Sequence, residues 1–161
     1  MLAGGCSRKA TIPFPAPARG GDPVTVTFDG NVSKQRRHLI EITHEWIGTP
    51  YKYAGAEKGV GTDCSGMVLR VYEEAASLKL PRNSAKQAEF CDRIDLDDVI
   101  PGDLVFFATN KNNDDISHVG IMLNHESFIH ASASKGVVIS TLSNPYYARS
   151  LRKFGRIPHF E

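Results

Sequence analysis

The sequence has no long hydrophobic run and almost no excess of charge. No apolar stretch approaches the ~20 residues that a helix needs to span a bilayer, which argues against a membrane-spanning protein. Its 19 basic and 18 acidic side chains leave a net charge of +1, which provides no electrostatic footprint for nucleic acid. With 161 residues, 41% of them hydrophobic, the chain is long enough to fold as one globular domain.

Cysteine is scarce, and the three cysteines are not paired in sequence. Cys6, Cys64 and Cys91 lie far apart and show none of the close spacings of zinc or redox sites. Because the number is odd, at least one thiol is free or modified. A single free cysteine usually packs as a small hydrophobe, and we expect this of Cys91, in a helix that begins at Ser84.

The first residues carry a lipoprotein-like pattern. Small residues precede Cys6, which resembles the end of a bacterial lipoprotein signal, where the cysteine is acylated and becomes the mature N-terminus. The charged and apolar regions of an export signal are absent before it, so an ordinary cysteine in a flexible tail is the alternative. An acylated Cys6 would anchor the protein to a membrane without spanning it.

Residues 1–32 differ in composition from the remainder of the chain. Ile12–Pro23 is rich in proline and glycine and predicts a semi-extended tether, although an arm packed on the domain would have the same composition. Val24–Phe28 alternates and predicts an edge strand. We therefore expect a lipobox-like segment and tether at 1–32 and a folded domain at 33–161.

The folded domain is expected to begin with a helix. Ser33 is a good N-cap for Lys34–Ile47, in which Leu39, Ile42 and Trp46 recur at helical spacing. Trp46 shares the apolar stripe of the other two, so we assign it to the core and not to ligand binding.

Cys64 begins a second helical pattern. Apolar residues recur every three or four positions from Cys64 to Ala75, which predicts an amphipathic helix with the cysteine in its first turn. Free amide groups and the positive end of the helix dipole lie there and favour thiolate over thiol. Thr62 or Asp63 is the predicted N-cap. The position favours a nucleophile over an inert packed thiol, and a nucleophile needs a base.

Two predicted strands carry the candidate bases His118 and His130. Ile116–Leu123 and Ser127–Ala131 each alternate, and a three-residue loop at 124–126 would give a hairpin in which opposed residue numbers sum to 250. In that register the two histidines are diagonal neighbours on one face, ~6–8 Å apart at their Cα atoms. A slip of one residue would separate them.

The alternative for Cys64, His118 and His130 is a zinc site. It would need a fourth ligand or water, and the three residues contain no close-spaced pair, so we favour thiol catalysis. Four other histidines are expected to be structural or exposed: His38, His44, His125 and His159.

Taken in order, the motifs resemble those of the NlpC-type cell-wall cysteine peptidases. The matching segments, within residues 36–157, are Pro50-Tyr51, Asp63-Cys64-Ser65-Gly66, Leu80–Gln87, Pro101–Phe107, His118-Val119-Gly120 and Phe128–Ala131. The resemblance implies an α+β papain-like fold, with N-terminal helices and the nucleophile helix packed on a central antiparallel sheet.

The resemblance also implies a chemistry. Cys64 would be the nucleophile, His118 the general base and acid, and His130 the third member that orients His118. The expected reaction is hydrolysis of amide bonds in peptidoglycan stem peptides by a monomer of the bacterial cell envelope or periplasm, without a cofactor. A non-catalytic peptidoglycan-binding protein and a thiol acyltransferase are the alternatives on the same fold.

Further residues match positions beside the cysteine. The resemblance places Tyr51, Asp63, Ser65 and Arg82 next to Cys64 or along the substrate groove, although Arg82 is also readable as a surface cation.

Three other features of the matching segments bear on structure more than on chemistry. Ala54 departs from the family, which usually has a glycine there. Ser84 and Gln87 fit a capping box. The turn at Pro101-Gly102-Asp103 is expected to serve the fold and not the chemistry.

Overall fold

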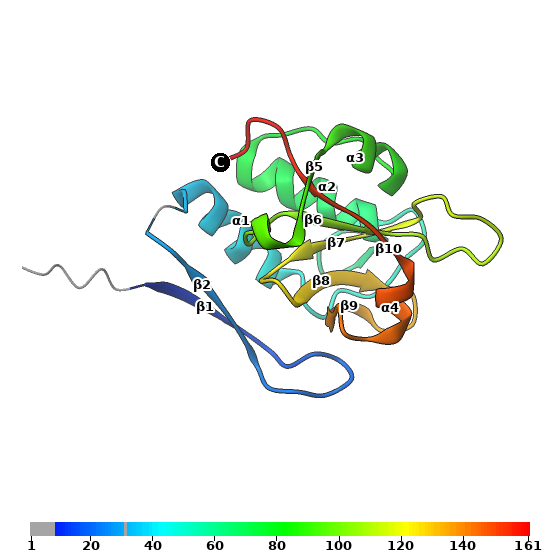
Figure 1. The fold of residues 1–161 in the computed structure, drawn as a ribbon, viewed down its shortest axis with the longest axis horizontal. Helices are drawn as coiled ribbons and strands as arrows, with labels where there is room; N and C mark the ends of the chain where they lie inside the picture. The colour runs from blue at the N-terminus through cyan, green and yellow to red at the C-terminus, as the bar shows by residue number, and fades with distance from the viewer. Residues whose placement is uncertain (1–8, 31) are drawn as a thin grey trace, which may run out of the picture.

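Helices and strands succeed one another irregularly in the computed structural model, which describes residues 9–30 and 32–161 (Figure 1). The helices in this range are α1 (Lys34–Glu45), α2 (Cys64–Ala76), α3 (Ser84–Phe90) and α4 (Pro145–Ser150), with a 3-10 turn η1 (Leu96–Asp98). The strands are β1 (Ala10–Phe14), β2 (Val24–Phe28), β3 (Ala56–Glu57), β4 (Gly61–Thr62), β5 (Asp92–Ile94), β6 (Leu104–Phe107), β7 (His118–Met122), β8 (Ser127–Ser132), β9 (Gly136–Thr141) and β10 (Leu151–Arg156).

The central sheet is antiparallel, with its strands in the order β5-β10-β6-β7-β8-β9. All four residues of β6 are buried, because the sheet is covered on both faces at this strand. Leu104 and Phe106 belong to the main core. Val105 and Phe107 belong to a second apolar cluster together with Phe128.

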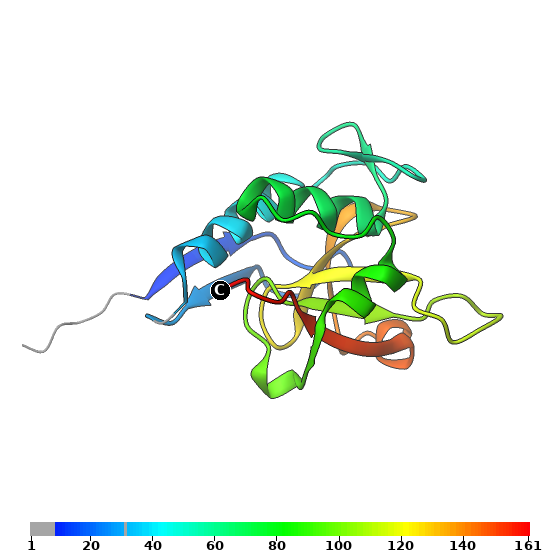
Figure 2. The same cartoon turned by 90° about the horizontal axis from the view of Figure 1, so that it is seen from above.

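Helices α1 and α2 pack against each other on one face of this sheet (Figure 2). The stripe that contains Leu39 and Trp46 is buried, as its helical spacing predicts. Ser33 caps α1 as expected, and the helix ends at Glu45. Because α2 also contacts β7 and β8, the start of the cysteine helix is held against the strands that carry the two histidines.

The first described residues form a hairpin packed on the domain. β1 and β2 pair antiparallel, and Phe14 and Val26 are buried in the main core. The edge strand predicted at Val24–Phe28 is confirmed. The semi-extended tether predicted over Ile12–Pro23 is wrong for Ile12–Phe14, which pairs as a strand, because apolar side chains on one face of the hairpin are buried against the domain.

The loop of this hairpin reaches the far edge of the central sheet. The amide of Ala18 donates a hydrogen bond to the carbonyl oxygen of Ile139 in β9, at 3.0 Å. Ala18 lies in a turn that is closed by a hydrogen bond from Gly20 N to Pro17 O, at 3.0 Å. The exposed side chain of Arg19 lies in this turn.

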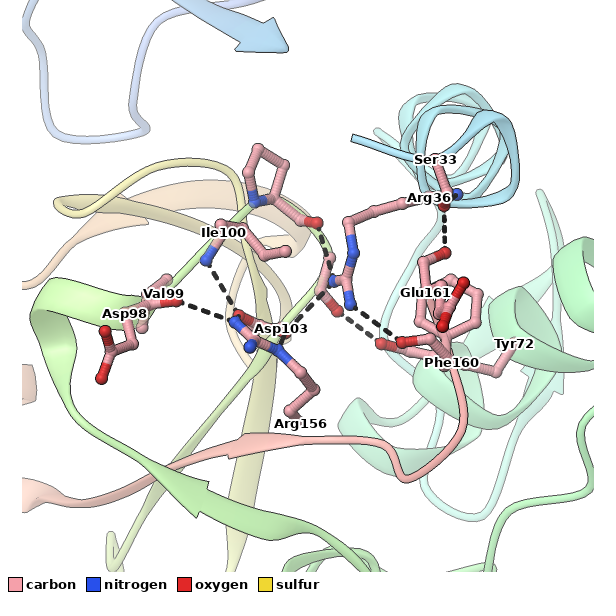
Figure 3. Close-up of polar contacts among 12 residues, drawn as sticks. Ser33, Arg36, Tyr72, Asp98, Val99, Ile100, Asp103, Arg156, Phe160 and Glu161 are labelled. Atoms are coloured by element: carbon pink, nitrogen blue, oxygen red, sulfur yellow. Dashed lines mark hydrogen bonds and ion pairs between the residues drawn. The ribbon is translucent and has the colours of Figure 1, made fainter. Parts of the chain in front are cut away.

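A buried ionic cluster ties distant parts of the chain together (Figure 3). The fully buried carboxylate of Asp103 accepts a hydrogen bond from Arg36 Nη1 at 3.1 Å and two from Arg156, Nε at 3.0 Å and Nη2 at 2.7 Å. The amide of Ile100 donates a fourth bond at 2.8 Å. The Asp103 carboxylate thus joins α1 to β10, and Arg36 also holds the C-terminal segment, because it donates to the carbonyl oxygen of Phe160 at 3.3 Å.

The turn predicted at Pro101-Gly102-Asp103 thus serves the fold, with Gly102 in the left-handed region at φ +96°. Among the described residues, no helix combines the length and apolarity that crossing a bilayer requires. Cys6, the candidate lipidation site, lies outside the described residues.

Candidate active site

Cys64 is the first residue of α2, as its apolar spacing predicts. Asp63 and not Thr62 is the N-cap, and its Oδ1 accepts a hydrogen bond from Gly66 N at 2.7 Å. A Cβ atom at Gly66 would lie 2.3 Å from the carbonyl oxygen of Gly55, so only glycine lets the preceding loop pass this close to the helix. The loop and the first turn therefore hold the cysteine in a fixed position.

The thiol of Cys64 is partly buried beside the start of β7. Burial raises its pKa above the ordinary value, the negative charge of Asp63 acts in the same direction, and backbone hydrogen bonds with Val119 and Ser65 offset the rise only in part. Burial therefore opposes the thiolate that the helix start favours. Because the ordinary pKa of a thiol already lies above 7, this rise favours the neutral thiol at neutral pH.

The two histidines meet as the predicted register requires. β7 and β8 pair with Ile121 opposite Ile129, so that opposed numbers sum to 250. His118 Nε2 lies 2.8 Å from His130 Nδ1, and the rings are nearly perpendicular, at 87°. His130 is fully buried, whereas His118 is half-buried and lines a cavity.

Burial keeps both rings neutral near pH 7. It lowers the pKa of His118 to about 4, and it lowers the pKa of His130 well below 6.5, helped by the charge of His118. If His118 is to accept a proton at Nδ1, its own hydrogen is on Nε2 and is donated to His130 Nδ1. Nδ1 of His118 is thus unprotonated near pH 7 and can accept a proton.

Ser140 completes this chain of hydrogen bonds, and sequence reasoning missed it. Its Oγ lies 2.8 Å from His130 Nε2, which carries a hydrogen when Nδ1 accepts from His118. β9 alternates so that Val137 and Ile139 are buried and Ser140 lies on the other face. The alternation of buried and less buried residues in the strand after His130 would have indicated that Ser140 lies on the face opposite Val137 and Ile139.

The thiol and the imidazole lie on adjacent elements. Helix α2, which begins at Cys64, packs against β7, which begins at His118, and the backbone of Val119 is among the groups that lower the pKa of the Cys64 thiol. Within the described residues, no hydrogen bond joins Cys64 Sγ to the His118 ring. Catalytic contacts of this kind often form fully only when substrate is bound.

The residues expected along the groove also gather around Cys64. Arg82 forms a bidentate ion pair with Asp63, at 3.0 and 2.9 Å, and donates to Ser65 Oγ at 2.9 Å. Arg82 is therefore held at the start of α2 and is not a free surface cation. Tyr51 forms an isolated bridge with Thr62, two residues before Cys64. Burial, followed by the charges of Cys64 and Asp63, raises its pKa.

A capping box at Ser84 and Gln87 is wrong. Asn83 is the N-cap of α3, with Oδ1 accepting from Lys86 N at 2.9 Å. The buried side chain of Gln87 instead donates to the carbonyl oxygen of Ser65 at 3.0 Å and so fastens α3 to the cysteine helix.

Ala54, the departure from the family, has φ +59°. This is the left-handed region that glycine adopts without strain. A glycine at this position would therefore relieve backbone strain.

A zinc site finds no support in the described part of the chain. No group of three or more histidine, cysteine, aspartate and glutamate residues there is arranged to hold a metal ion.

Comparisons with known proteins agree with this geometry. Residues 48–156 match the model of the NlpC/P60 family. The chain is 39% identical over 157 residues to the probable endopeptidase NlpC of Escherichia coli K12, covering 98% of this chain and 94% of that protein. It is 35% identical over 127 residues to the murein DD-endopeptidase MepS/murein LD-carboxypeptidase of the same strain, covering 79% of this chain and 65% of that protein.

Solved structures resemble the fold as well. A protein of Staphylococcus aureus Mu50 described as similar to lipoprotein, of the NLP/P60 family, superposes with a TM-score of 0.72 at 27% identity. The match covers 83% of this chain but 46% of that one, so this chain spans about half of its length. The α+β papain-like fold is therefore confirmed, and the chain belongs to the NlpC/P60 family.

Proposed function

We propose that this protein is a cysteine endopeptidase that hydrolyses amide bonds in the stem peptides of peptidoglycan. The observation that carries the proposal is the hydrogen-bonded pair of His118 and His130 on strands that pack against the helix beginning at Cys64. The printed names of the two relatives, an endopeptidase and a murein endopeptidase, support the same reaction and substrate class.

In the proposed mechanism the resting thiol is activated only when it reacts. His118 Nδ1 takes the proton of Cys64 as the sulfur attacks the scissile carbonyl carbon, while Nε2 donates to His130 and stabilises the imidazolium. The amide of Cys64, at the helix start, is a donor for the developing oxyanion. His118 then protonates the leaving amine, and water, deprotonated by His118, hydrolyses the thioester and restores the thiol.

Other assignments accompany this proposal. Tyr51, Asp63, Ser65 and Arg82 would border the bound stem peptide. We place the protein in the cell envelope or periplasm, as a monomer. We also propose that acylated Cys6 is an anchor and that the β1–β2 hairpin, whose apolar side chains join the main core, is an arm of the domain.

The test is digestion of purified sacculi with mass spectrometry of the released fragments. Wild type should release muropeptides, and Cys64→Ala should release none while keeping the same circular dichroism spectrum and thermal midpoint. Release by the alanine variant would overturn the assignment. Binding to sacculi without release would favour the non-catalytic alternative, and amine-dependent products would favour acyl transfer.

A further inference from the structure

A cavity of about 360 Å³ opens on the histidine side of the site. His118 and His130 are part of its lining, and Cys64 is not. The other walls come from the loop of the β1–β2 hairpin, from the turn between β8 and β9, and from the start of α4. The N-terminal hairpin and the C-terminal part of the chain therefore enclose space next to the catalytic base.

The charged side chains that line this cavity are all basic. Arg19 from the hairpin loop and Lys135 from the β8–β9 turn line it, and no aspartate or glutamate does. Both cations are exposed, and neither takes part in an ion pair within residues 9–30 and 32–161. The opposite side of the cysteine differs, because Arg82 there is neutralised by Asp63.

Both cations are carried by anchored segments. The bond from Ala18 N to Ile139 O fixes the residue before Arg19 on β9. Gly136, which follows Lys135, has φ +74°, and a Cβ atom there would lie 2.5 Å from the carbonyl oxygen of Thr49, so this turn is pressed against the loop after α1. The backbone that carries the two cations is therefore anchored at the cavity rim.

Hydroxyl and amide groups complete the lining. Ser132 and Ser134, whose hydroxyls hydrogen-bond each other at 3.3 Å, and Asn144 contribute side chains with groups that can donate to an anion. Burial raises the pKa of the Tyr147 phenol, which also lines the cavity, and the charge of Arg19 is a minor opposing effect. An anionic group bound there would meet cations and neutral donors but no carboxylate of the protein.

We propose that Arg19 and Lys135 form a carboxylate subsite that selects stem peptides with a free carboxylate in the leaving group. The proposal rests on the proposed function, in which His118 protonates the leaving amine. Since the cavity is lined by His118 and not by Cys64, it receives the part of the substrate that departs with that amine. A carboxamide at the same position would lose the charge attraction but keep its size.

The test uses two synthetic stem peptides that differ only in this group, one with the free carboxylate and one with the carboxamide. Wild type should have a kcat/KM for the carboxylate peptide ~10-fold above that for the carboxamide, which corresponds to one charge-assisted contact. Arg19→Gln with Lys135→Gln should abolish that preference by slowing only the carboxylate peptide. The preference should also weaken as salt is raised.

Arg93→Gln is the matched control, because it removes an exposed arginine from β5 at the opposite edge of the sheet. It should leave the preference unchanged. An equal effect of the double substitution on both peptides, or the same loss in the control, would overturn the subsite.

Binding separates failure of the subsite from failure of the proposed function. Titration calorimetry of both peptides against Cys64→Ala, with and without the two substitutions, reports the preference without turnover. If wild type cleaves neither peptide while Cys64→Ala binds the carboxylate peptide more tightly, the proposed function fails and the subsite stands. If wild type cleaves both at equal rates and binding shows no preference, the subsite fails and the proposed function stands.

Discussion

Removing the Asp103 carboxylate should cost more stability than any exposed ion pair of the protein. Asp103→Ala deletes four hydrogen bonds and leaves Arg36, which is 1% exposed, with its charge uncompensated. Arg156 keeps access to water, because its side chain is 32% exposed. Breaking one side of a buried ion pair typically costs ~3–5 kcal/mol, and we expect a value in that range, dominated by Arg36.

The measurement is urea unfolding followed by circular dichroism, together with thermal unfolding. At ~2–4 °C per kcal/mol for a chain of this size, the thermal midpoint should fall by roughly 10 °C. Asp103→Asn keeps the shape and one acceptor oxygen and should lie between wild type and alanine.

Asp114→Ala is the matched control for this substitution. Asp114 also pairs with an arginine, Arg152 at 3.1 Å, but its side chain is 93% exposed, so the cost should be under ~1 kcal/mol. An equal cost for Asp103→Ala and the control would refute the reasoning that desolvation makes the buried cluster costly to break.

Three further predictions concern the site. Burial raises the pKa of Cys64, so its alkylation by iodoacetamide should be half-maximal above pH ~8.5. Mass spectrometry of the Cys64 peptide measures this alkylation. A midpoint below pH 7 would show a preformed ion pair instead. Burial lowers the pKa of His118 from 6.5 to about 4, and it lowers that of His130 as well. The unfolded chain therefore binds more protons than the folded protein in this range. The stability that the neutral rings contribute above pH 6.5 is lost as the pH falls from 6.5 towards 4. In urea unfolding, wild type should lose more stability over that window than a variant with both histidines replaced by glutamine, and parallel curves would contradict this. Finally, Ser140→Ala leaves His130 Nε2 without its acceptor and should lower kcat with little change in KM. Ser140→Thr, which keeps the hydroxyl, should recover the activity. A change in KM alone would assign Ser140 to substrate contact.

Local patterns predicted the parts of the site that depend on periodicity. The apolar spacing after Cys64 placed it at a helix start, and alternation with a three-residue loop gave the register that joins His118 to His130. Both features are set by neighbours in the chain, so they are visible in a short window of sequence.

Features set by distant contacts were not predictable. The pKa of Cys64 depends on how deeply the thiol is buried, which no spacing reports. Asp103 meets partners 67 and 53 positions away. Pro13 is tolerated in β1 because this strand pairs on one side only, with β2, and an edge strand accepts a residue without an amide hydrogen. The proline-rich composition around Pro13 indicated a tether, although a strand forms there.

Intact-protein mass spectrometry of the enzyme, quenched in acid during the first turnover of a stem peptide, tests most directly whether Cys64 is the nucleophile. Wild type should gain the mass of the acyl part of the substrate, and peptide mapping should locate it on Cys64. The Cys64→Ala variant should gain nothing and release no product. Hydrolysis by that variant, or an acyl group attached to another residue, would contradict a mechanism in which the neutral thiol is activated by His118.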